Sequence, residues 1–109
     1  AYYLNFTKVV TVKHVLLNML KSTEQSIFPP VKLEVWGGMD KHQMKELGML
    51  TPKMPKKNEP PVLIQPEIKF AATEVKYLKI IATPIRALPS WHDSKGERGW
   101  VFISEIVVN

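Results

Sequence analysis

The residue types that carry out covalent chemistry are sparse in this chain of 109 residues. It contains no cysteine, which excludes disulfides, thiolate metal sites and a cysteine nucleophile. The three histidines, His14, His42 and His92, are too scattered to indicate a zinc site. No nucleophile elbow, phosphate-binding loop or HExxH motif is present in the sequence. These observations predict a domain without catalytic activity of its own.

The carboxylates near the end of the chain do not change that prediction. They are Asp93, Glu97 and Glu105, and their spacing alone does not define the acid–base pair that glycoside hydrolysis requires. His92 and Asp93 are neighbours in sequence, but adjacency does not make a catalytic triad.

Residues 83–99, TPIRALPSWHDSKGERG, combine an aromatic ring with polar groups in one long expected loop. Trp91 can stack on the apolar face of a sugar ring, while Arg86, His92 and Asp93 can hydrogen-bond its hydroxyl groups. The alternative is that Trp91 packs the loop against the domain and His92 caps a local turn. Both interpretations predict an ordered loop.

Two other tryptophans lie in expected strands. Trp36 is predicted to point outward beside Gly37 and Gly38, where it is either a surface platform for sugar or is covered by a neighbouring loop. Trp100 alternates in step with Phe102, and this pattern predicts that both lie in the core.

Length and composition predict one compact domain, residues 1–109. Hydrophobic residues make up 45% of the chain and charged residues 23%, as in ordinary globular domains. The net charge is +5, but the lysines are spread along the chain and not interleaved with stacking aromatics, so nucleic-acid binding is not expected. The apolar runs are far shorter than the roughly 20 residues of a membrane-spanning helix.

Short alternating or β-branched runs, separated by proline and glycine, predict an all-β antiparallel sandwich. Residues 51–61 carry four prolines and predict an extended connection. Residues 43–50 favour a short strand, and Pro66 predicts that the strand around it is an edge strand or is broken there. The remaining strands are expected at residues 2–6, 9–20, 31–36, 64–70, 75–82 and 100–108.

Two segments carry a resemblance to a known family. Residues 27–40, IFPPVKLEVWGGMD, followed by KELGML, resemble the middle of a discoidin-like (F5/8 type C) domain. Residues 75–108, which contain the PSWH, GW and SEI strings, are similar to the C-terminal domain attached to Bacteroides-type chitobiases and β-hexosaminidases. The resemblance covers residues 9–109.

The resemblance implies an eight-stranded jelly-roll sandwich of the galactose-binding-domain-like type. It further implies a non-catalytic ancillary domain of a periplasmic, cell-surface or secreted glycoside hydrolase. Such a domain binds carbohydrate, for example a glycan containing N-acetylhexosamine or galactose, or packs on the catalytic domain of its parent enzyme. A purely structural or protein-interaction sandwich without sugar affinity is the alternative.

The same resemblance bears on metal binding and on the start of the chain. Glu105, in the string ISEI, matches a glutamate that related sugar-binding modules use as a calcium ligand; the alternative is a glutamate bonded to a loop or a lysine. Discoidin-like domains usually run to about 150 residues and begin with strands before the equivalent of Tyr2. Either this sequence is a fragment that lacks them, or this member is short. If they are absent, an unpaired sheet edge is expected at residues 2–6.

Overall fold

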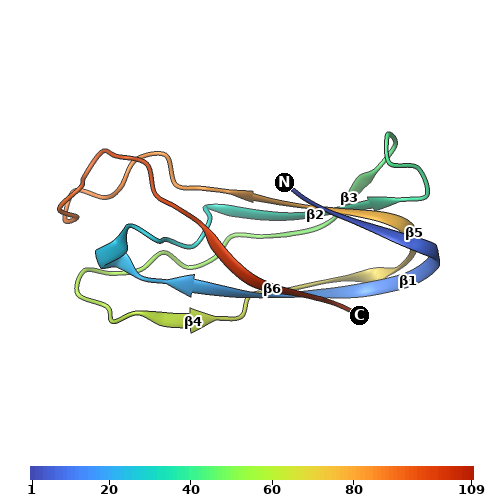
Figure 1. The fold of residues 1–109 in the computed structure, drawn as a ribbon, viewed down its shortest axis with the longest axis horizontal. Helices are drawn as coiled ribbons and strands as arrows, with labels where there is room; N and C mark the ends of the chain where they lie inside the picture. The colour runs from blue at the N-terminus through green and yellow to red at the C-terminus, as the bar shows by residue number, and fades with distance from the viewer.

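The computed structural model describes all residues, Ala1–Asn109, and its regular secondary structure is almost entirely antiparallel β-strand (Figure 1). The strand order is β3-β2-β5-β1-β4, with β6 also paired to β1. A single turn of 3-10 helix, η1 (Thr23–Gln25), follows β1. No helix is long and apolar enough to span a membrane. The strands are β1 (Tyr2–Lys21), β2 (Lys32–Gly38), β3 (Lys45–Leu50), β4 (Val62–Ile64), β5 (Glu67–Thr83) and β6 (Phe102–Val108).

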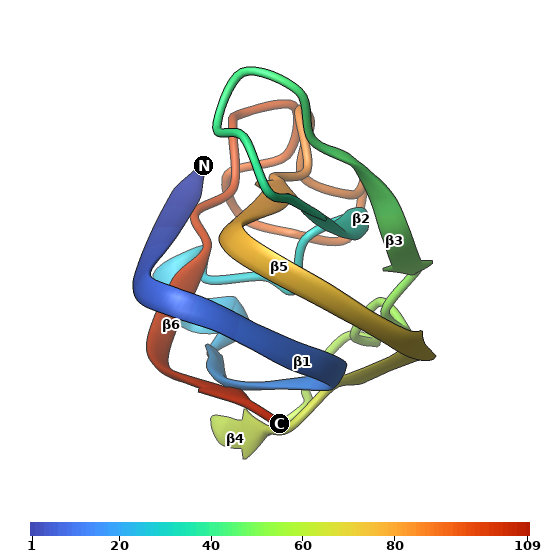
Figure 2. The same cartoon turned by 90° about the vertical axis from the view of Figure 1, so that its right-hand side faces the viewer.

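The sheet folds over itself because its two longest strands bend together. β1 has 20 residues and β5 has 17, and Figure 2 shows them side by side as they turn from one layer into the other. Their pairing register shifts between Asn5 and Val10 and again between Val12 and His14, as expected where a strand bends sharply. The sequence analysis expected two strands in each of these regions, whereas each is one continuous bent strand.

The core lies between the two layers. Val15, Leu17 and Met19 of β1 alternate inward and are at most 1% exposed, as their shared side of the strand predicts. Leu78 and Ile80 of β5 meet them from the other layer, fully buried. The opposite side of this part of β1 is only partly buried, so β1 is packed on one face and not on both.

The last strand corrects one prediction. Trp100 is 64% exposed and Phe102 is 51% exposed, so neither lies in the core. The reason is a β-bulge: Glu105 pairs with Asn18, but Ile103 pairs with the next residue of β1, which leaves Ser104 as an extra residue. A bulge reverses the alternation of side chains along a strand, which the sequence pattern does not reveal.

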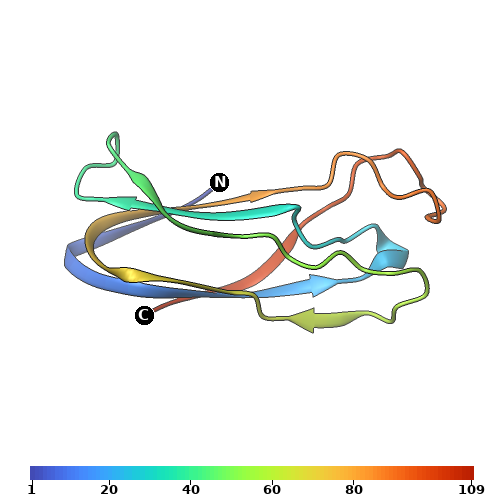
Figure 3. The ribbon, with the colours of Figure 1, turned by 180° about the vertical axis from the view of Figure 1, so that it is seen from behind.

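Proline positions shape the remaining connections as predicted. Gln65 and Pro66 separate β4 from β5, and the chain between β3 and β4 has no regular secondary structure through most of its length. Figure 3 shows this connection running along the back of the molecule to the end where the long loops gather, before the chain returns as β4.

Candidate functional site

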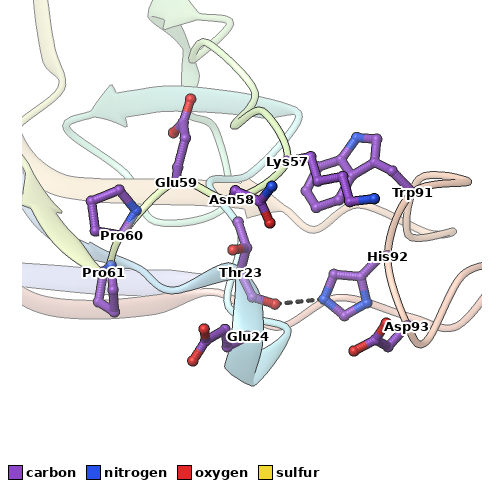
Figure 4. Close-up of a pocket in the computed structure, with 10 residues that line it drawn as sticks. All are labelled: Thr23, Glu24, Lys57, Asn58, Glu59, Pro60, Pro61, Trp91, His92 and Asp93. Atoms are coloured by element: carbon purple, nitrogen blue, oxygen red, sulfur yellow. Dashed lines mark hydrogen bonds between the residues drawn. The ribbon is translucent and has the colours of Figure 1, made fainter.

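A polar cleft of about 700 Å³ lies at the loop end of the molecule (Figure 4). Three segments that are distant in sequence form it. They are the start of η1, with Thr23 and Glu24, residues 57–61 of the proline-rich connection, and residues 91–93 of the long loop. Ten residues line the cleft, and Trp91 is the large aromatic one among them.

Backbone hydrogen bonds order the long loop that carries Trp91. Leu88 donates its N–H to the Glu97 carbonyl and accepts from the Gly96 N–H, at 2.7 and 3.0 Å. The Gly99 N–H donates to the Ile85 carbonyl at 3.2 Å. Gly96 has φ +82°, a conformation that glycine adopts without strain. These hydrogen bonds join the two halves of the loop, which is ordered as its sequence predicts.

His92 fastens this loop to η1. Its Nε2 bonds the backbone carbonyl of Thr23, and its Nδ1 accepts the backbone N–H of Ser94 at 2.9 Å. These partners require the proton on Nε2. The ring is 9% exposed, and both of its nitrogens are engaged. His92 therefore positions the cleft wall and has no free nitrogen to offer a ligand.

Trp91 has a dual environment. Its ring stacks on Phe28 with centroids 6.1 Å apart and an interplanar angle of 26°, while Phe28 itself is 1% exposed. Trp91 remains half-buried and lines the cleft. The same side chain thus packs the loop against the domain and presents apolar surface to the cleft, which combines the two roles that the sequence analysis set against each other.

Glu59 fixes the proline-rich connection to the end of β1. One carboxylate oxygen pairs with Lys21 Nζ at 2.5 Å, and the other accepts the Lys56 N–H at 3.0 Å. The hydrogen bond from Lys21, and after it that from Lys56, lower the pKa of Glu59. Between Lys56 and Glu59 the chain turns through Asn58, whose φ is +66°. This turn brings Lys57 and Asn58 to the rim of the cleft.

The remaining polar groups of the cleft are available to a ligand. Glu24, Lys57 and Asp93 line it, and none of them forms an ion pair within 4.0 Å. Figure 4 shows Glu24 and Asp93 on either side of His92, with Asn58 and Lys57 nearer Trp91. Carboxylate, amide and ammonium groups around one aromatic ring are suited to a polar ligand with an apolar face, hydrogen-bonded at several points.

The structure brings together three of the five residues predicted to contact carbohydrate. Trp91, His92 and Asp93 share the cleft. Trp36 lies on the outer face of β2, where Lys79 Nζ sits 5.2 Å from its ring centroid and Trp36 Nε1 donates to Glu34 at 3.3 Å. Arg86 is exposed and lines a separate hollow with Arg98. Neither Trp36 nor Arg86 lines the cleft.

Glu105 lies on β6, away from the cleft. Its carboxylate accepts a hydrogen bond from Asn18 Nδ2 at 3.1 Å, and no group of three or more histidine, cysteine, aspartate or glutamate side chains is placed to hold a metal. Calcium takes six to eight oxygen ligands. The hydrogen bond from Asn18 adds no support to the calcium site at Glu105, which stays a prediction.

Sequence reasoning did not identify Glu24, Lys57 and Asn58 as part of the site. The string KKNEPP signals a turn, but nothing in the sequence indicates that this turn meets the Trp91 loop. The chain matches no protein-family model and no curated protein.

Proposed function

We propose that this protein is a non-catalytic ancillary domain of a glycoside hydrolase, with a galactose-binding-domain-like jelly roll, and that it binds carbohydrate in the loop-end cleft. The observation that carries this proposal is the half-buried Trp91 ring in a cleft edged by unpaired polar side chains. The resemblance of residues 75–108 to the chitobiase-associated domain supports the choice of ligand class.

In this proposal the apolar face of a sugar ring stacks on Trp91. Asn58, Lys57 and Asp93 donate to or accept from its hydroxyl or acetamido groups. His92 acts indirectly, because its bonds to Thr23 and Ser94 hold the Trp91 loop against η1. Trp36 and Arg86 take no part in this cleft.

Binding is tested by calorimetric titration with N-acetylhexosamine oligomers and with galactosides. The wild-type domain should bind at least one of them, and Trp91→Ala should abolish that binding. Asn58→Gly should weaken it several-fold without strain, because glycine accepts the positive φ of this position. Trp36→Ala is the matched control and should bind like wild type.

A second candidate function is supported by the packing of Trp91 on Phe28. If the domain is purely structural or docks on a catalytic domain, Trp91→Ala should lower stability while wild-type protein binds none of these glycans. Thermal melts recorded beside the titrations distinguish this result from the loss of a carbohydrate site.

A further inference from the structure

Two unpaired strand edges run along one side of the molecule. Residues 2–11 of β1 pair only with β5, and β6 pairs only with β1 at residues 15–20. Figure 2 shows this part of β1 and β6 on the same side, opposite β3. We call the region between these two free edges the seam. The free edge of β1 is the one expected at residues 2–6.

Neighbouring residues mark the two ends of the seam. At one end Ala1 and Tyr2 line a hollow of about 540 Å³ together with Trp100 and Val101. At the other end the N–H groups of residues 13 and 14 donate to the Asn109 carbonyl, at 2.8 and 3.0 Å. The two free edges therefore run in the same direction, so one added strand can lie antiparallel to both.

The inner side chains along the seam are less well covered than the rest of the core. Leu4 and Phe6 of β1, and Ile103, Ile106 and Val108 of β6, pack against the core but stay partly exposed. The core side chains of β2 and β5 are at most 2% exposed. The apolar interior thus reaches solvent along the seam, and further burial there is favourable.

The other edges of the sheet carry protection that the first part of the β1 edge lacks. β3 has Lys45 and Glu46 on its edge, and β4 is only three residues long, between Pro61 and Pro66. Charged side chains, prolines and short length are the usual devices against strand pairing. Residues 1–7 contain neither a charged side chain nor a proline.

We infer that the seam binds one extended strand of another polypeptide, with apolar residues at alternate positions and acidic residues at its ends. The alternation fits the half-exposed inner side chains. The acidic ends fit the charge of the seam: Arg98 lines the hollow beside Ala1, and Lys8 and Lys13 lie toward the other end. β1 contains no acidic residue, and the single one on β6, Glu105, is bonded to Asn18.

A second copy of the chain is a poorer occupant on the same grounds. Antiparallel pairing of two β1 edges places the Lys8 end of one copy beside the Ala1 and Arg98 end of the other. Like charges brought together in this way oppose association.

The probe is a synthetic peptide as long as β6, alternating valine with threonine and carrying an aspartate at each end. Hydrogen exchange should slow at backbone amides of residues 2–11 when this peptide is added. The same peptide with a central proline, which cannot complete the ladder, should give no protection. Lys8→Glu should lose peptide affinity several-fold, while the exposed position leaves the fold intact.

The inference is overturned if the peptide leaves these amides unprotected, or if they are already protected by dimers of the chain alone. It is independent of the carbohydrate proposal. Trp91→Ala should therefore bind the peptide as wild type does, and Lys8→Glu should leave any glycan binding unchanged.

Discussion

The strand layers and the loop end hold their side chains in place by different means. Between the layers, ten buried apolar residues form one continuous core, with no polar member. At the loop end, Phe28 is equally buried but lies outside that core and contacts Trp91 and His92. There, hydrogen bonds through His92 and Glu59 join segments that are distant in sequence.

This difference explains why the candidate site is at the loop end. Apolar packing between the layers leaves no room for polar groups, because buried polar groups must be paired. Short segments tied by specific hydrogen bonds can instead leave Glu24, Lys57 and Asp93 unpaired at the surface. The loop end therefore exposes functional groups that the strand core cannot hold. Substitutions in the core should affect stability alone, and substitutions at the loop end should also affect binding.

The largest expected effect is that of Phe28→Ala. Removing this ring should lower the free energy of unfolding by about 4 kcal/mol, as large aromatic truncations in cores do, and should remove the surface on which Trp91 stacks. Leu78→Ala, in the strand core, should lower it by about 3 kcal/mol. Denaturant unfolding measures both.

The two variants differ in what remains of the site. Where both proteins are still folded, Phe28→Ala should shift the tryptophan fluorescence and lose any glycan binding. Leu78→Ala should have the fluorescence and the glycan binding of wild type. Equal loss of glycan binding in the two variants would show that the loop end has no packing unit of its own.

An intermediate effect is expected at Gly99, where the long loop returns to β6. A Cβ built at this position lies 2.5 Å from Ile85 Cγ2 and 3.3 Å from Leu88 Cδ2, so Gly99→Ala should destabilise the protein by about 2 kcal/mol through overpacking. Gly96→Ala is the matched comparison. It meets no neighbour within 4 Å but has φ +82°, and it should be destabilised by about 1 kcal/mol.

Thermal melts rank the two glycine variants. A larger loss for Gly96→Ala than for Gly99→Ala would mean that backbone conformation, and not close packing, determines the stability of this loop.

Features set by local sequence patterns could be predicted, whereas features set by contacts between distant segments could not. Alternation put Val15, Leu17 and Met19 on one side of their strand, and Pro66 marked an edge or a break, because both patterns are local. That only this side of the strand is fully buried was not predictable, because the other side also carries apolar residues. The positions of Trp100 and Phe102 depended on the bulge at Ser104, which is set by pairing with a strand more than 80 residues earlier. Alternation within one strand carries no information on that pairing.

The residues of the candidate site show the same limit of local patterns. The composition of the long loop singled out Trp91 and His92, which do meet in the cleft. Lys57 and Asn58 lie beside Glu59, which bonds Lys21 across 38 positions of the chain, a contact that residue spacing does not reveal. Trp36 was predicted from its outward parity and Arg86 from its place in the same loop as Trp91, and the fold places both on other surfaces.

The smallest expected effect is the pH dependence contributed by Glu59. Hydrogen bonds from Lys21 and Lys56 lower its pKa in the folded protein, below the value of about 4.3 for an unfolded glutamate. The ionised form is therefore favoured by folding. Its contribution to stability is fully present above the unfolded pKa and is lost as the pH falls through the folded pKa.

Melting temperatures of wild type and Glu59→Gln, recorded from neutral pH downward through the unfolded pKa, measure this contribution. Wild type should be slightly more stable at neutral pH, and the two curves should converge on acidification. Added salt should reduce the neutral-pH difference, because the Lys21 pair lies near the surface. Curves that stay parallel across the range would show that the carboxylate charge does not hold the proline-rich connection to β1, and that its packing alone positions Lys57 and Asn58 at the cleft.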